Sequence, residues 1–159
     1  MELKVLEGRS TVRVQARATM HSVKASGNAI SGSVTVDPED VPGTLKLDLA
    51  VEIAGIRSGD FLTDMSSRRH VDTDRHPVAR FVLTRASGTP RALRIEGTID
   101  WRGRKVPIAT TATGEIEGTT ARGTASFDLD MRGFDLEAPR FLFLKVQDVV
   151  HVEVEIVAG

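Results

Sequence analysis

Cysteine and tyrosine are absent from this 159-residue chain, which has one tryptophan and six phenylalanines. Without cysteine, the chain has no thiol catalyst, disulfide bond or cysteine-based zinc site. So few aromatic side chains also argue against a stacking platform for single-stranded nucleic acid. The length suits a single domain with its own hydrophobic core, spanning residues 1–159.

An excess of one charge is missing as well, because 21 Lys and Arg face 22 Asp and Glu, for a net charge of −1. This balance argues against a partner such as DNA, RNA or an anionic membrane surface. No apolar run approaches the roughly 20 residues of a transmembrane helix. The start, Met1 to Glu7, lacks the apolar segment of a signal peptide. We therefore expect a cytoplasmic protein, or a periplasmic one if a signal has been removed.

What the chain does have is alternation of apolar and polar residues. In Leu45–Ile53 every odd position is apolar, and most even positions are polar. Alternate residues of a strand share a face, so this pattern predicts a sheet with one buried and one solvated side. The same pattern recurs in five further stretches: Val12–Ala18, Ile30–Val36, Arg91–Trp101, Thr124–Met131 and Val150–Ile156.

Turn-forming residues separate these stretches, as in Asp37–Gly43, Ser87–Pro90 and Arg102–Arg104. Eight to ten strands spaced in this way predict an all-β sandwich or barrel. One segment, Ser58–His70, does not alternate. Its Phe61, Leu62 and Met65 follow helical spacing, and Ser58 is a suitable N-cap, so one short helix is expected there.

The inward face of the sheet combines large and small residues. Small inward residues either leave a cavity or accommodate tight bends and the taper of a barrel. By the parity of each strand, the large inward residues are Leu45, Leu47, Leu49, Val51, Leu93, Ile95, Ile108, Phe127 and Leu129. The small ones are Ala16, Ala18, Gly32, Gly97, Ala112, Gly114, Gly123 and Ala125.

One stretch near the end of the chain, Pro139–Lys145, is apolar on both parities and includes Phe141. A half-solvated strand does not show this pattern. Three interpretations remain open: it closes the mouth of a barrel against Phe61 and Met65, it forms a homodimer surface, or it packs under a loop.

A polar segment raises the alternative of a metal site. His70, Asp72, Asp74 and His76 recur at every second position, so in an extended chain they would share a face and could bind zinc. A metal-dependent hydrolase would follow if one coordination position stayed open. The ordinary interpretation is a polar loop before Pro77.

Other catalytic patterns are not found. No serine lies in a G-x-S-x-G elbow, and the glycines form no phosphate-binding loop. We therefore expect no enzyme, no catalytic residue and no cofactor.

Four stretches together resemble the YceI-like family of polyisoprenoid-binding, lipocalin-like barrel proteins. They are His21–Val23 with Ser31–Val34, Ile56–Met65 with His76–Phe81, Ile95–Arg104, and Phe134–Pro139 with Val146–Val150. Each motif is weak alone, but their order covers nearly the whole chain.

The resemblance implies a closed antiparallel β-barrel of about eight strands in a bacterial protein. It also implies that the barrel binds, sequesters or transports a long apolar ligand, such as a polyisoprenoid, a quinone tail or a fatty-acid derivative. The alternative is a ligand-free barrel that acts through a protein partner in a stress-related or structural role. The residues expected to contact the ligand in the barrel and at its mouth are Ala16, Leu47, Leu49, Leu93, Ile95, Ile108, Ala112, Ala125, Phe127, Phe61, Met65 and Phe141.

Overall fold

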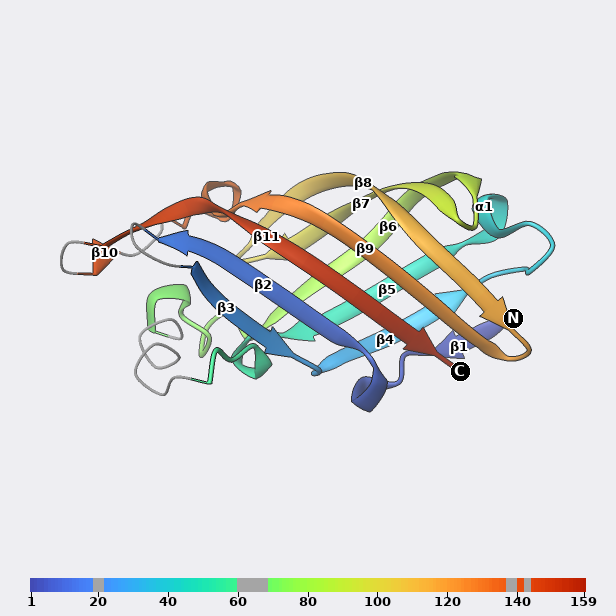
Figure 1. Cartoon of the computed structure of the whole chain (residues 1–159), viewed down its shortest axis with the longest axis horizontal. Coiled ribbons are helices and arrows are strands. Elements are labelled where there is room, and N and C mark those ends of the chain that lie inside the picture. Colours follow the sequence, from blue (N-terminus) through green and yellow to red (C-terminus); the bar gives the residue numbers. More distant parts are fainter. Residues whose placement is uncertain (19–21, 60–68, 137–139, 142–143) are drawn as a thin grey trace.

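The computed structural model shows an all-β chain whose strands form one antiparallel sheet (Figure 1). It describes residues 1–18, 22–59, 69–136, 140–141 and 144–159. The strands are β1 (Glu2–Lys4), β2 (Thr11–Ala18), β3 (Ser22–Gly27), β4 (Ile30–Thr35), β5 (Lys46–Glu52), β6 (Val78–Thr89), β7 (Ala92–Trp101), β8 (Arg104–Glu117), β9 (Thr120–Asp130), β10 (Arg140–Phe141) and β11 (Leu144–Ala158). Short helical turns are η1 (Glu7–Arg9), α1 (Val41–Thr44), η2 (Ile53–Gly55) and η3 (Met131–Phe134).

Ten strands follow one another across the sheet in the order β1-β4-β5-β6-β7-β8-β9-β11-β2-β3, and β10 pairs only with β11. The sheet curls strongly into a half-barrel (Figure 1). A closed barrel of about eight strands, as the sequence led us to expect, is not what the structure shows. The two edge strands, β1 and β3, are three and six residues long and do not pair with each other.

Short hydrogen-bonded pairs outside the ladder hold both edges in place. Beyond β1, the Leu6 amide donates to the Val157 carbonyl at 2.8 Å, and the Gly159 amide donates to the Lys4 carbonyl at 3.0 Å. At the other edge, Ser26 of β3 and Arg57 exchange two bonds of 2.9 Å. The edges are therefore tied to neighbouring segments and do not present long free ladders to solvent.

The alternating stretches became strands as predicted, and alternating burial is clearest in β8, which was not among those stretches. From Val106 to Glu117 its residues switch between half-buried and exposed at every step. The hairpin between β7 and β8 is a two-residue turn, Arg102-Gly103, in which both residues have positive φ, 57° and 71°. Turns of this kind match the right-handed twist of the paired strands.

A seam interrupts the sheet between β8 and β9. The two strands pair only from Ala112 with Ala125 to Glu117 with Thr120, although β8 begins at Arg104. Beyond the paired part, the Thr110 hydroxyl donates to the Ser126 carbonyl at 2.7 Å. Pro107 lies in the part of β8 that pairs with β7, opposite Thr98, but not with β9, so its missing N–H costs no bond on the β9 side.

The structure describes one of the two predicted connecting segments in full and only the end of the other. The Asp37–Gly43 turn leads into the short helix α1, whose N-cap Asp40 accepts a hydrogen bond from the Gly43 amide at 3.1 Å. The helix expected over Ser58–His70 falls mostly outside the described residues, and only residues 69–71 are seen to be helical.

Among the helices that the structure describes, none is long and apolar enough to cross a membrane.

Two hydrophobic clusters stabilise the fold. The larger one lies near the termini and α1, and includes the buried residues Leu3, Val5, Ile30, Val36 and Val41. The smaller one is built around Trp101 and Phe134, whose rings meet edge-on with centroids 5.3 Å apart. Each cluster therefore closes part of the curled sheet with apolar side chains.

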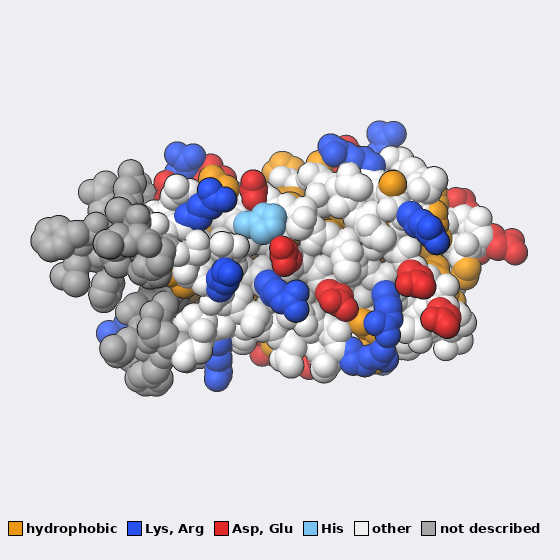
Figure 2. All heavy atoms as spheres, in the orientation of Figure 1, with side chains coloured by type: hydrophobic (Ala, Val, Ile, Leu, Met, Phe, Trp, Pro, Cys, Tyr) orange, Lys and Arg blue, Asp and Glu red, His pale blue; other side chains and the backbone are white. Residues whose placement is uncertain are grey.

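The outer surface is polar and mixed in charge. On the face shown in Figure 2, basic and acidic side chains are interspersed, and hydrophobic side chains form only small spots. This arrangement agrees with the near-zero net charge of the sequence.

Candidate functional site

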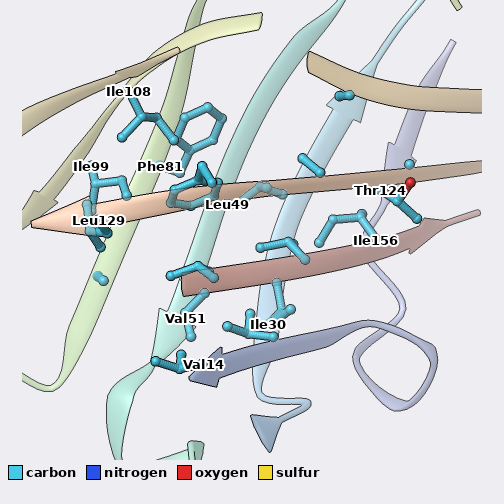
Figure 3. Close-up of a pocket in the computed structure, with 18 of the residues that line it drawn as sticks. Val14, Ile30, Leu49, Val51, Phe81, Ile99, Ile108, Thr124, Leu129 and Ile156 are labelled. Atoms are coloured by element: carbon cyan, nitrogen blue, oxygen red, sulfur yellow. The ribbon is translucent and has the colours of Figure 1, made fainter. Parts of the chain in front are cut away.

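A cavity of about 770 Å³ lies inside the curled sheet. Its wall is made mostly of aliphatic side chains from β2, β4, β5, β7, β8, β9 and β11, with Phe81 from β6 (Figure 3). A space of this size, lined in this way, suits one apolar molecule of modest size.

The inward side chains of the strands border this space. On β8, the half-buried positions Ile108, Ala112 and Ile116 lie on the cavity, because they share the inward parity of the strand. On β9, Ala125, Phe127 and Leu129 do the same. These inward residues are half-buried, since the interior in front of them is not filled by other side chains.

Nine of the twelve ligand-contacting residues predicted from the sequence line the cavity. They are Ala16 of β2, Leu47 and Leu49 of β5, Leu93 and Ile95 of β7, Ile108 and Ala112 of β8, and Ala125 and Phe127 of β9. Phe61 and Met65 lie outside the described residues. The backbone of Phe141 belongs to β10, and its side chain is outside the described part of the chain.

Two of the small inward residues, Gly32 and Gly97, do not open space, which is the second of the two alternatives left open by the sequence. A Cβ on Gly97 would come within 2.4 Å of the Phe81 ring, so this aromatic side chain already occupies the position. Gly32 has a φ of 135°, and a Cβ there would meet the Asp48 carbonyl oxygen at 2.0 Å. Gly97 is therefore required for side-chain packing, and Gly32 is required for a close backbone approach.

Other small residues leave their space to the cavity. A Cβ on Gly114 would make only ordinary contacts, the nearest with Leu93 at 3.6 Å, and Gly123 has only a carbonyl at 3.7 Å. Both glycines line the cavity, as do Ala112 and Ala125. At Gly114, Gly123, Ala112 and Ala125 the small side chains therefore leave space to the cavity, which is the first of the two alternatives.

The Trp101 cluster at one end of the cavity was not predicted. The Trp101 Nε1 donates to the His76 carbonyl at 3.0 Å, and Arg102 Nη1 donates to the Val71 carbonyl at 2.6 Å. Arg102 Nε also donates to the Phe134 carbonyl at 3.2 Å. These bonds hold the segment before β6 and the η3 turn against the β7–β8 hairpin. The lone tryptophan at the end of an alternating run was the only sequence signal for it.

The metal-site hypothesis is not supported by the structure. The segment from His70 to His76 is not extended: Asp72 has a φ of 55°, and its carbonyl accepts hydrogen bonds from the amides of Arg75 and His76 at 3.1 and 3.0 Å. The four side chains therefore do not share a face. Across the described part of the chain, no three His, Cys, Asp or Glu side chains are grouped so that they could hold a metal ion.

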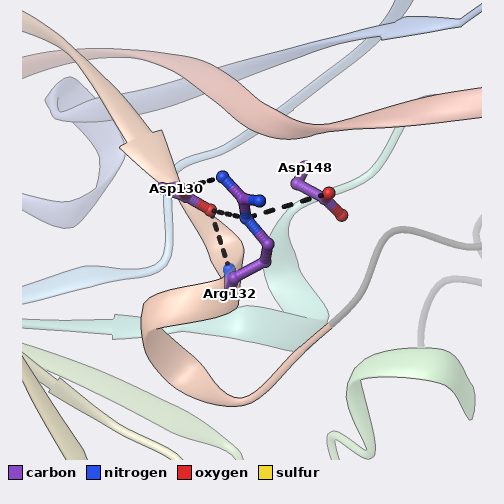
Figure 4. A network of polar contacts seen from close by, with 3 residues as sticks. All are labelled: Asp130, Arg132 and Asp148. Carbon is purple, nitrogen blue, oxygen red and sulfur yellow. Dashed lines mark hydrogen bonds and ion pairs between the residues drawn. The ribbon is translucent and has the colours of Figure 1, made fainter.

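Two pairs of opposite charges are formed by exposed side chains. Asp48 follows Leu47 on the opposite face of β5, where Arg80 Nε donates to its carboxylate at 2.8 Å. This hydrogen bond lowers the pKa of Asp48 below its usual value. Arg132 of η3 pairs in the same way with Asp130 at 2.8 Å and reaches Asp148 at 3.9 Å (Figure 4), and its hydrogen bond lowers the pKa of Asp130.

Comparison with known proteins identifies the family and structures with a similar fold. A family model described as the YceI-like domain matches residues 4–158. The fold is similar to that of BcnA from Burkholderia cenocepacia, with a TM-score of 0.85, 16% identity and coverage of 98% of this chain and 99% of that one.

Two further solved structures have the same fold. A polyisoprenoid binding domain from Saccharophagus degradans, described as implicated in plant cell wall breakdown, has a TM-score of 0.81 at 14% identity, with coverage of 99% and 97%. The YCEI protein of Campylobacter jejuni has a TM-score of 0.71 at 15% identity, with coverage of 85% and 83%. Comparison with curated proteins finds no match. At these identities the structures show a shared fold.

Proposed function

The chain belongs to the YceI-like domain family, and from this premise we propose that it binds one long apolar molecule inside its curled sheet. The observation that carries the proposal is the apolar cavity of about 770 Å³. A structural neighbour described as a polyisoprenoid binding domain favours a polyisoprenoid as the ligand class. A quinone tail or a fatty-acid derivative has the same apolar chemistry.

The size of the cavity limits the ligand. At about 30 Å³ for each non-hydrogen atom, which is the share of one molecule in liquid water, the cavity holds roughly 25 such atoms. Each buried CH₂ contributes about 0.8 kcal/mol, so a dozen contribute about 10 kcal/mol. The cost of association is about 4–15 kcal/mol, so a tail of a dozen carbons offsets the lower part of this range, and each further buried CH₂ offsets more of it.

The contacts along the tail come from the nine predicted residues that line the cavity. Phe61, Met65 and Phe141 stay predictions, as do homodimer formation through residues 139–145 and the cytoplasmic location. The biological role we propose is sequestration or transport of the ligand, with no catalytic residue and no cofactor.

Identification of the bound molecule tests the proposal directly. The protein is purified from its natural host, extracted with organic solvent, and the extract is analysed by mass spectrometry against quantified protein. We expect an apolar molecule in a near-stoichiometric amount. A protein that carries none and also fails to bind an added apolar dye would instead favour a role through a protein partner.

Filling the cavity gives a second test. Ala112 faces the cavity from β8, so Ala112→Phe places a ring in the space of the ligand without disturbing the outer face. We expect the fold to be kept and the affinity for the fluorescent apolar dye N-phenyl-1-naphthylamine to fall by about tenfold or more. Circular dichroism and dye titration measure the two effects.

The matched control is Ala109→Phe on the same strand, where the side chain is exposed on the opposite face. It should bind the dye as the wild type does. Equal dye binding by both variants would contradict a ligand site inside the sheet. Loss of folding in Ala112→Phe alone would show that the interior is already full.

A further inference from the structure

Thr73 is a buried hydroxyl residue in the wall of the apolar cavity. Only 9% of its surface is exposed, and it lines the cavity together with Val71, Ile53 and Trp101. In the described part of the chain, no hydrogen bond joins its hydroxyl to another residue. A buried hydroxyl without a partner is unfavourable, and native proteins rarely keep one without a reason.

Ser10 shows how this fold normally treats a buried hydroxyl. It is fully buried, and it both donates to the Val157 carbonyl at 3.3 Å and accepts from the Val157 amide at 3.0 Å. Ser10 and Thr73 are the two buried polar residues in the described part of the chain. Of these two residues, only Thr73 borders the cavity. A molecule bound in the cavity can therefore be a hydrogen-bond partner for Thr73 but not for Ser10.

The backbone around Thr73 is held firmly from both sides. Two residues before it, the Val71 carbonyl accepts from Arg102 at 2.6 Å, and three residues after it, the His76 carbonyl accepts from Trp101 at 3.0 Å. The Pro77 carbonyl then accepts from the Ile53 amide at 2.9 Å. A side chain on a turn fixed in this way is suited to orient a bound group.

We propose that the Thr73 hydroxyl hydrogen-bonds the polar head group of the apolar ligand and so fixes which end of the ligand lies at the Trp101 end of the cavity. This inference rests on the proposed apolar-ligand function and adds the chemistry of the head group.

The head group that fits is a neutral oxygen, such as an alcohol, a quinone carbonyl or an ester. A single threonine hydroxyl supplies one donor and two acceptor lone pairs, and no charge. The neighbouring Arg102 already donates to the carbonyls of Val71 and Phe134.

The test compares two probes with the same carbon skeleton, phytol, which ends in a hydroxyl, and phytane, which is the hydrocarbon. Each displaces N-phenyl-1-naphthylamine from wild type, Thr73→Val and Thr73→Ser. We expect Thr73→Val to bind phytol about fivefold to tenfold more weakly and phytane equally well, because one hydrogen bond is lost. Thr73→Ser should recover most of the phytol affinity. Thr111→Val, at an exposed position of β8, serves as the control and should change neither probe.

The outcomes separate this inference from the proposed function. If Thr73→Val binds both probes as the wild type does, the Thr73 contact is wrong and apolar binding stands. If Thr73→Val loses both probes equally, Thr73 supports the wall of the cavity and does not bind a head group, which also overturns the proposal. If the wild type binds neither probe nor the dye, the proposed function itself fails.

Discussion

At the scale of single residues, Gly97 and Phe81 show how a cross-strand contact limits the cavity. Phe81 of β6 is diagonal to Gly97 of β7, since Leu83 is the residue directly opposite. Gly97→Ala would force a methyl group into the Phe81 ring and the Val82 carbonyl, at 2.4 and 2.7 Å. We expect a loss of about 1–3 kcal/mol in the free energy of unfolding, measured by urea denaturation.

Gly114→Ala is the matched control, because it adds the same methyl group to an inward glycine with only ordinary contacts around it. It should be neutral, or stabilising by up to about 1 kcal/mol, since alanine restricts the unfolded chain. Equal effects at the two positions would contradict the assigned role of Phe81. Adding Phe81→Leu to Gly97→Ala should recover part of the loss, because the two sites are in contact.

Residue parity could be read from the sequence, and it identified the cavity wall well. Alternation is enough to place Leu47, Ile95 and Ala125 on one face of their strands. It does not show which small residue has a neighbour in front of it, because that depends on the register of two strands and on side-chain rotamers. For this reason the sequence left open whether Gly97 opens the cavity or allows close packing, and Thr73 was treated only as part of a polar loop.

At the scale of elements, the seam between β8 and β9 should be visible in hydrogen exchange. From Arg104 to Thr111, β8 pairs with β7 but not with β9. The backbone amides in this part that point away from β7 should therefore exchange about tenfold or more faster than those from Ala112 to Glu117. Exchange measured residue by residue with NMR checks this.

The paired half of the same strand is the internal reference for that experiment. Uniform protection along all of β8 would contradict an open seam. Pro107 is the one sequence signal for the seam, because a proline in an alternating run indicates an edge or a bulge. The sequence of β8 gives no indication that this unpaired edge lies between two strands of the same sheet. The pairing of β8 with β9 could therefore not be predicted from the sequence.

The element types were more predictable than their boundaries. The alternating runs all became strands, and the Arg102-Gly103 turn became the β7–β8 hairpin. The segment from His70 to His76 was different, because the left-handed Asp72 and the bonds to its carbonyl create a turn that alternation cannot reveal. The metal hypothesis depended on an extended backbone, which this segment does not have, so the structure does not support it.

At the scale of the whole molecule, the sequence predicted the all-β class and the family, which the comparison confirmed. It did not predict how the sheet ends. Whether a curled sheet closes depends on the length and position of its edge strands, and here β1 and β3 are short and joined to other segments.

The cavity has a volumetric consequence for the protein as a whole. Unfolding eliminates internal void volume, and the volume change of unfolding scales with that void. With a cavity of about 770 Å³, the empty protein should unfold at lower pressure than the protein filled with phytol, with a volume change toward the large end of about −20 to −100 mL/mol. The single Trp101, buried against Phe134, is a natural fluorescence reporter for this measurement. Identical pressure midpoints with and without phytol would mean that the ligand does not occupy the void. The pressure midpoint of unfolding therefore reports whether the ligand lies inside the sheet.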